Sequence, residues 1–178
     1  PRSEIEIMGE STATLVVGPS LYKAANILKN RTAVPDYHFD GLMGLDDCDA
    51  FTQALAEISG KPVPEKIERH RAQLQDAMVD SHFMIGFARV ALAADPDLLG
   101  MQVRFLTGMG AEIVSAVSPH KHESLNSLPI AKVIIGDLED MEKQARAADA
   151  QFIMANSHAA ETASRLGIPL MRAGFPQY

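Results

Sequence analysis

The second half of the chain alternates short apolar runs with amphipathic segments, and this rhythm constrains the fold more than any other feature. Five runs have the length and composition of buried strands, at residues 89–94, 112–117, 132–135, 152–155 and 169–172. Strands that alternate with helices pair in parallel through right-handed crossovers, with helices on both faces of the sheet. The sequence therefore predicts an α/β fold, with a Rossmann-like domain built on one parallel sheet and part of a second α/β domain before it.

Helix-start signals support the alternation. Asp95 precedes Pro96, and this pair combines an N-cap residue with a proline in the first helical turn. Asp137 precedes an acidic first turn, which the helix dipole favours. Asn156 or Ser157 can cap the helix that follows the fourth strand. We therefore expect three helices to begin directly after strands.

The first half of the chain carries weaker signals. Strands are expected at 13–18 and 34–39, followed by a helix capped by Asp46 or Asp47 and a long helix from Pro64 to about Met84. We expect two parts: residues 1–86, an α/β region with a connecting helix, and residues 87–178, a further α/β domain. Because the final Gly-Phe-Pro corner directs the backbone onward, we also expect the chain to belong to a longer protein.

Composition excludes several classes of function. The net charge of −7 argues against a nucleic-acid partner, because phosphate binding needs a basic face. No apolar run is long enough to cross a membrane, so no membrane partner is expected. The single cysteine, Cys48, cannot form a disulfide within the chain. A cytoplasmic location is expected.

Ligands of open parallel sheets bind at the carboxyl ends of the strands. No glycine-rich dinucleotide or phosphate motif follows any expected strand, so nothing supports NAD or ATP binding. The candidate cofactor-binding residues at these ends are Ser157, His158, Arg172 and Phe175. Three of the four have a simpler alternative role: the 156–158 segment can merely cap a helix, and Arg172 can form an ion pair at a strand end.

Neither a catalytic set nor a metal site is predicted. No Ser-His-Asp or Cys-His nucleophile arrangement follows from local spacing. His120 and His122 can ligate a metal only with a third residue, and a solvated loop is the simpler interpretation. Cys48 can be a cluster thiolate or, more simply, a small packed residue.

Several segments together resemble the nitrogenase component 1 family. They are Leu45 to Val63, Arg71 to His82, Ala88 to Leu99, Asn156-Ser157-His158 and Ile168 to Pro176. Within the family the chain is similar to β-type subunits, which comprise the β chain of the molybdenum–iron protein and a subunit of the cofactor-assembly scaffold. The short connection from Ser118 to Ile130, with residues 136–140 and 166–169, looks more like the scaffold subunit.

The resemblance implies a protein of three α/β domains. Residues 1–86 correspond to the later part of the middle domain with its connecting helix, and residues 87–178 to most of the third. The family's cluster cysteines lie in the first domain, and Cys48 matches none of them. Where α-type subunits hold the large cofactor through Cys and His, this chain has Gly18-Pro19 and Arg172 to Pro176. We therefore expect no cofactor on this chain alone.

For the full assembly, the resemblance implies an iron–sulfur cluster or a precursor of the iron–molybdenum cofactor. It also implies an α-type scaffold subunit as partner in a heterotetramer, along with other cofactor-assembly proteins. The expected role is that of a non-catalytic scaffold subunit. Two alternatives stay open: the β subunit of nitrogenase, which is an oxidoreductase, and a small-molecule-binding regulatory α/β module.

Overall fold

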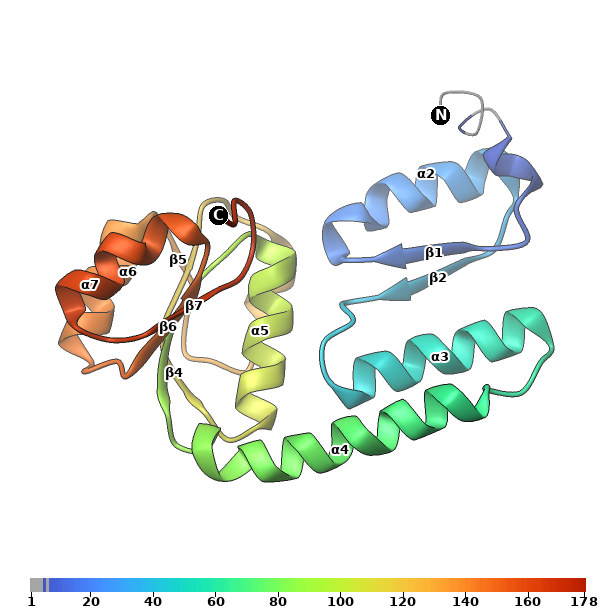
Figure 1. Cartoon of the computed structure of the whole chain (residues 1–178). Coiled ribbons are helices and arrows are strands. Elements are labelled where there is room, and N and C mark those ends of the chain that lie inside the picture. Colours follow the sequence, from blue (N-terminus) through green and yellow to red (C-terminus); the bar gives the residue numbers. More distant parts are fainter. Residues whose placement is uncertain (1–4, 6) are drawn as a thin grey trace. The chain divides into compact units, whose positions relative to one another are not determined.

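The computed structural model describes residue 5 and residues 7–178. The chain divides into two compact units, Pro1–Gln73 and Leu74–Tyr178, and each unit is considered by itself. The long helix α4 (Glu65–Ile85) runs from the first unit into the second, and its length agrees with the predicted helix from Pro64 to about Met84 (Figure 1).

The first unit contains a small parallel sheet. Strands β1 (Thr14–Val17) and β2 (Asp36–Phe39) pair in parallel around helix α2 (Tyr22–Thr32), with the short turns η1 (Met8–Glu10) and η2 (Pro19–Leu21) before it. Helix α3 (Leu45–Ser59) follows β2. Among the described residues of this unit, few apolar ones are buried: Val16, Ala25, Val34, Phe39 and Ala54.

The start of α3 differs from the sequence-based prediction. The N-cap position is Gly44, whose φ of 88° is a conformation that glycine adopts readily. Asp46 and Asp47 therefore lie in the first turn and do not cap the helix. The Asp47 carboxylate instead accepts a hydrogen bond from the backbone N–H of Met43 at 3.3 Å, so it still satisfies a backbone donor at this end.

The second unit is built on the predicted parallel sheet. Its strands are β3 (Arg89–Ala93), β4 (Glu112–Ser118), β5 (Ile134–Ile135), β6 (Phe152–Ala155) and β7 (Leu170–Arg172). The order is β5-β4-β3-β6-β7 and every pairing is parallel, which confirms the predicted sheet. The third strand is shorter than the predicted 132–135, because only Ile134 and Ile135 pair with β4.

Helices α5 (Pro96–Gly108), α6 (Leu138–Ala147) and α7 (Ala160–Leu166), with turns η3 (Glu123–Ser127) and η4 (Ser157–Ala159), connect these strands. The alternation of side chains along the strands divides the core into two layers. Val90 and Leu92 face α5 and η3, whereas Ala91 and Ala93 face α6 and α7. Small residues on the second face allow α6 and α7 to approach the sheet closely.

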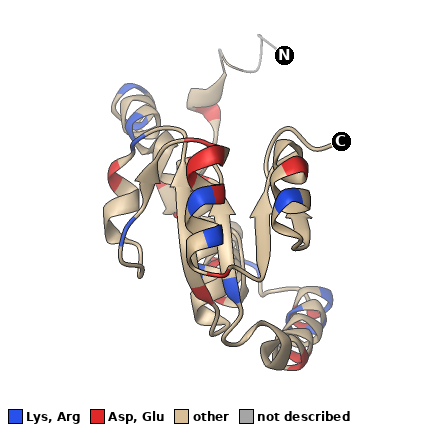
Figure 2. Ribbon diagram, turned by 90° about the vertical axis from the view of Figure 1, so that its left-hand side faces the viewer, with Lys and Arg blue, Asp and Glu red and all other residues tan. Residues whose placement is uncertain are grey.

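Charge on α6 and α7 follows the direction of each helix. Glu139 and Asp140 lie in the first turn of α6 and Glu161 in that of α7, while Arg146 and Arg165 lie in the last turns (Figure 2). This arrangement complements the helix dipole, which is positive at the N-terminus and negative at the C-terminus.

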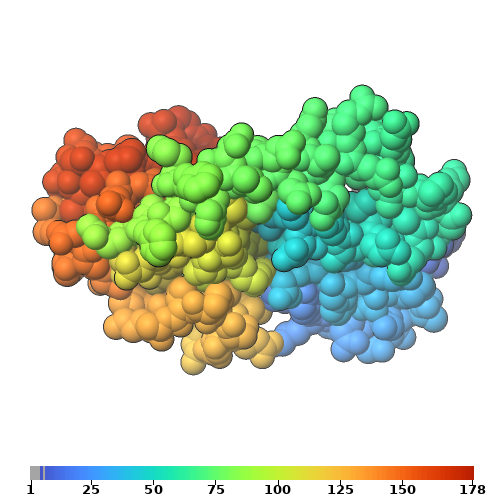
Figure 3. All heavy atoms as spheres, turned by 90° about the horizontal axis from the view of Figure 1, so that it is seen from below, coloured from blue at the N-terminus to red at the C-terminus, as the bar shows by residue number. Residues whose placement is uncertain are grey.

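The end of α4 is apolar and exposed. The exposed fractions are 84% for Phe83, 83% for Met84 and 92% for Phe87. The space-filling view shows this light-green end of α4 uncovered on the face displayed (Figure 3). Within the described part of the chain, the search for a helix long and apolar enough to cross a membrane finds none.

Candidate functional site

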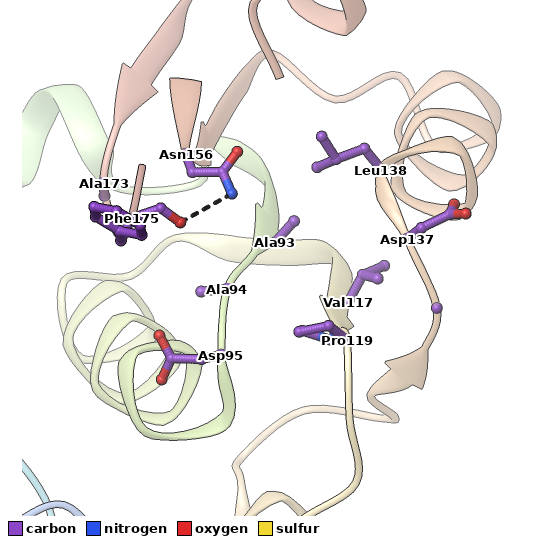
Figure 4. Close-up of a pocket in the computed structure, with 12 residues that line it drawn as sticks. Ala93, Ala94, Asp95, Val117, Pro119, Asp137, Leu138, Asn156, Ala173 and Phe175 are labelled. Carbon is purple, nitrogen blue, oxygen red and sulfur yellow. Dashed lines mark hydrogen bonds between the residues drawn. The ribbon is translucent and has the colours of Figure 1, made fainter. Parts of the chain in front are cut away.

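A cavity of about 310 Å³ opens at the carboxyl ends of the strands in the second unit (Figure 4). The strand order places it at the switch point, since the chain runs outward from β3 through β4 to β5 and then returns to β6 on the other side. This is where open α/β sheets bind ligands. The lining residues come from the ends of all five strands: Ala93, Ala94, Asp95, Val117, Pro119, Gly136, Asp137, Leu138, Asn156, Ala173, Gly174 and Phe175.

Three of the lining residues cap the elements that start at this edge. Asp95 accepts a hydrogen bond from the backbone N–H of Leu98 at 3.1 Å. Asp137 accepts from the backbone at Glu139, at 2.9 Å, and forms a capping box with Asp140. These bonds confirm the predicted caps and turn both carboxylates toward the starts of their own helices, as Figure 4 shows.

Asn156 links two strand ends. Its side-chain oxygen accepts from the backbone N–H of His158 at 3.1 Å and caps the turn η4, whereas the predicted helix itself, α7, has Ala159 at its N-cap and no side-chain cap. Its amide nitrogen donates to the backbone carbonyl of Phe175 at 3.3 Å, the bond drawn as a dashed line at the edge of the cavity in Figure 4. Asn156 thereby fixes the corner after β7 against the end of β6.

The cavity has a definite electrostatic character. Two carboxylates, those of Asp95 and Asp137, line it, and no lysine, arginine or histidine does. Most of the remaining lining is apolar, from residues such as Val117, Leu138 and Ala173. Because both carboxylates accept backbone hydrogen bonds at the starts of their own helices, the surface that faces the cavity is mainly apolar.

Two of the predicted site residues hold the C-terminal segment. The Ser157 hydroxyl accepts from the backbone N–H of Tyr178 at 2.9 Å and donates to its carbonyl at 3.2 Å. Nδ1 of His158 lies 3.0 Å from the Tyr178 hydroxyl, and the two rings meet edge to face. Ser157 is buried and His158 exposed, and neither lines the cavity.

The other two predicted residues lie on β7 and just after it. Arg172 is exposed at the end of the strand and is not a lining residue. Its carbonyl accepts a hydrogen bond from the Gln177 side chain at 3.1 Å. Phe175 does line the cavity, although its side chain remains 93% exposed. The structure thus brings Phe175, of the four, to the cavity wall.

Sequence reasoning missed the lining positions at which a residue larger than glycine would make a close contact. Gly136 is one, because a Cβ there would clash with the carboxylate of Asp140, which accepts from the N–H of Asp137 at 3.2 Å. Gly174 is another: its φ is 89°, and a Cβ there would lie 3.0 Å from a methyl group of Leu98. The signal in the sequence was the occurrence of small residues directly after strands, which spacing alone did not distinguish from ordinary turns.

The remaining candidates have structural roles. Nδ1 of His122 accepts from the backbone N–H of Ser124 at 3.3 Å and caps η3. Burial, together with the charges of Asp47 and Asp49, raises the pKa of the Cys48 thiol. A raised pKa disfavours the thiolate that binds metal. Among the residues that the structure describes, no group of three or more His, Cys, Asp or Glu could hold a metal ion.

Comparison with known proteins extends these observations. The family model described as "Nitrogenase component 1 type Oxidoreductase" matches residues 1–178. The nitrogenase iron-molybdenum cofactor biosynthesis protein NifN of Klebsiella pneumoniae is 42% identical over 178 residues, covering 100% of this chain and 39% of its own length. NifN of Nostoc sp. is 45% identical over 175 residues, covering 98% of this chain and 39% of its own length.

A solved structure described as "Nitrogenase Cp1 at pH 6.5" matches with a TM-score of 0.85 and 28% identity, covering 95% of this chain and 40% of that chain. The chain thus spans about two fifths of the length of these relatives. Since the family model covers every residue and the structural match reproduces the parallel-sheet fold, the chain belongs to the nitrogenase component 1 family.

Proposed function

We propose that this chain is part of a NifN-type scaffold subunit, on which a precursor matures into the iron–molybdenum cofactor of nitrogenase. The observation that carries the proposal is a difference in identity. Proteins named NifN are 42% and 45% identical to essentially the whole chain, while the solved nitrogenase chain is 28% identical. The nitrogenase β subunit is therefore the less favoured alternative.

The proposal includes the setting of the chain. Residues 1–86 would be the later part of a middle domain with its connecting helix, and residues 87–178 most of a third domain. The partner would be an α-type, NifE-like subunit in a cytoplasmic heterotetramer that also meets other cofactor-assembly proteins. In such an assembly this chain would supply sheet framework and binding surface rather than catalytic groups.

The metal cluster is the cargo of this proposed function, and the strand-end cavity does not fit it as a direct ligand set. No cysteine or histidine lines the cavity, and two carboxylates do. Thiolate and imidazole are the side chains that bind iron in such clusters. Cluster ligands would therefore come from other parts of the assembly.

The proposed contribution of this chain to the cargo lies beside the cavity. Arg172 is exposed at the end of β7, and Phe175 lines the cavity although it is largely exposed. Ser157 and His158 hold the segment that carries Phe175 through their bonds to Tyr178. We infer that the exposed residues His158, Arg172 and Phe175 form a surface that orients an anionic cargo, with Arg172 supplying the positive charge and the buried Ser157 holding the C-terminal segment in place.

A chimera tests the proposed function. The matching segment of Klebsiella pneumoniae NifN is replaced by this chain, and the chimera is expressed in a strain that lacks NifN. We expect extracts to deliver mature cofactor to cofactor-free nitrogenase component 1, measured as recovered substrate reduction. The same segment placed in the nitrogenase β subunit is the matched comparison. Recovery by the β-subunit chimera together with failure of the NifN chimera would support the alternative.

A further inference from the structure

The connection between β4 and β5, residues 119–133, encloses a second hollow, which is separate from the strand-end cavity. Its volume is about 440 Å³. Apolar residues form part of its wall, and Leu125 and Leu128 among them are buried, each 8% exposed. Ile135, at the end of β5, also lines it. The hollow lies wholly within the second unit.

None of the polar side chains that line this hollow is acidic. They are Lys121, His122, Asn126 and Lys132, and no aspartate or glutamate lines the hollow. Lys121 and Lys132 stand near opposite ends of the connection, and neither is engaged in a hydrogen bond or ion pair with any described residue. Both lysines are exposed, and Glu123, which lies on the same connection, does not line the hollow.

His122 adds a donor whose position is determined by its backbone contact. The backbone N–H of Ser124 donates to Nδ1 at 3.3 Å, and the Ser124 hydroxyl lies 2.8 Å from the same nitrogen. Since a backbone N–H can only donate, Nδ1 must act as acceptor, and the proton of the neutral ring is on Nε2. The Nε2 N–H of His122 is therefore a hydrogen-bond donor even when the ring is neutral.

We propose that this hollow is a binding site for a small oxyanion, either phosphate or the carboxylates of a short organic acid. Ammonium groups and an imidazole N–H form charge-assisted hydrogen bonds with both kinds of oxygen. The apolar wall accommodates the carbon chain of an organic acid, which phosphate lacks. The lining differs from that of the strand-end cavity, which has no lysine, arginine or histidine.

Calorimetric titration of the full chain with sodium phosphate, and separately with sodium succinate, tests the site at low ionic strength in chloride buffer. We expect saturable binding of one anion per chain. Lys121→Gln combined with Lys132→Gln should weaken it by at least about tenfold, since two charge-assisted hydrogen bonds are lost. Binding of phosphate but not succinate would identify the ligand of the site as a compact oxyanion. Stronger binding of succinate would identify the ligand as an organic acid.

The control removes the same charge elsewhere. Lys61→Gln combined with Lys66→Gln leaves the hollow intact and should leave the affinity unchanged. On the unaltered chain, the imidazole signal of His122, assigned through His122→Gln, should shift on addition of the anion. Absence of saturable binding by both anions, or equal weakening in the two double variants, would overturn the proposal.

Discussion

Phe87 combines an unusual backbone with an exposed ring. Its φ is 64°, in the left-handed region, and its side chain is 92% exposed. The backbone is held there because its N–H donates to the carbonyl of Gly110 at 2.8 Å. A residue with a Cβ pays about 1–2 kcal/mol in this region, which glycine avoids.

We therefore predict that Phe87→Gly raises the free energy of unfolding by roughly 0.5–1 kcal/mol, after allowance for the greater freedom of glycine in the unfolded chain. Urea denaturation measures the change. Phe87→Ala is the matched control, because it removes the ring and keeps the Cβ, and it should change the free energy by less than about 0.5 kcal/mol. Equal stabilisation by both variants would assign the effect to the ring.

Gln102 is a buried polar residue without a hydrogen-bond partner. Its side chain is 0% exposed on the inner face of α5, and both its amide atoms lack a partner. Such a group retains the penalty of leaving water without compensation. Gln102→Met keeps the length of the side chain, and we predict that it raises the free energy of unfolding by about 1 kcal/mol. Loss of stability would mean that a bound water satisfies the amide.

Arg172 provides the test of the proposed cargo surface. Because its exposed guanidinium has no described partner, Arg172→Ala should leave the thermal stability of the full assembly unchanged. Cofactor maturation should fall, and Arg172→Lys should restore it in part. Arg31→Ala, at an exposed position of α2, is the control. Unchanged maturation in Arg172→Ala would leave this arginine an ordinary surface residue.

At the residue level, local chemistry was predictable and distant contacts were not. Asp95 and Asp137 cap their helices as predicted, because a cap depends on residues two or three positions away, while Asn156 caps the turn η4 that precedes the predicted helix. The bonds of Ser157 and His158 to Tyr178 join positions about twenty residues apart. They arise from the path of the segment after β7, which no local pattern encodes.

At the level of elements, α6 and α7 are joined by one carboxylate. Glu142 is 15% exposed and lies 2.7 Å from Nη2 of Arg165 and 3.1 Å from Nη2 of Arg146. Hydrogen bonds from Arg165, and then from Arg146, outweigh burial and lower the pKa of Glu142 from 4.5 to about 2. The ion pair between Glu142 of α6 and Arg165 of α7 therefore links two helices that cover the same face of the sheet.

The lowered pKa of Glu142 determines the direction in which the stability of the folded state changes with pH. A carboxylate whose pKa falls on folding stabilises the folded state above its unfolded pKa, and this contribution disappears as pH falls through the folded pKa. Glu142→Gln should therefore lower the melting temperature at pH 7, and the difference from the parent should shrink between pH 4.5 and about 2. Melting curves across this range measure it.

Glu139→Gln is the control within the same helix. Glu139 pairs with Lys143 at 2.8 Å, but the two side chains are 74% and 67% exposed. Water screens such a pair, so the melting temperature should change far less than in Glu142→Gln. Equal changes in melting temperature in the two variants would show that general surface charge, rather than the ion pair between α6 and α7, determines the effect of Glu142→Gln.

The boundaries of two elements, β5 and α3, were predicted incorrectly from the sequence. The parallel sheet of the second unit was predictable because each strand is a separate apolar run between strong helix signals. The two-residue strand β5 was predicted too long, since Lys132 and Val133 line the hollow beside it and do not pair with β4. The start of α3 was misplaced because Gly44 competes with two aspartates as the boundary signal.

For the whole molecule, the two units differ in how much core they contain. Both buried clusters of the five-stranded sheet, around Leu92 and around Ile153, lie in the second unit. The described part of the first unit has a two-stranded sheet and a handful of buried apolar side chains. Isolated two-stranded structures are marginally stable in water. The composition of the chain gave no sign of this asymmetry, because apolar residues occur in both halves.

This difference in core size predicts that the two units have different free energies of local opening. Hydrogen exchange followed by mass spectrometry should show the slowest amides in β3, β4 and β6, with β1 and β2 exchanging at a clearly lower free energy of opening. Leu92→Ala, at a fully buried position, should cost about 2–5 kcal/mol and lower the protection of the second unit. Because β1 and β2 open by their own local equilibrium, their exchange should stay unchanged in this variant. Equal protection of the two units, and an equal loss in Leu92→Ala, would instead show that the chain unfolds as one cooperative body.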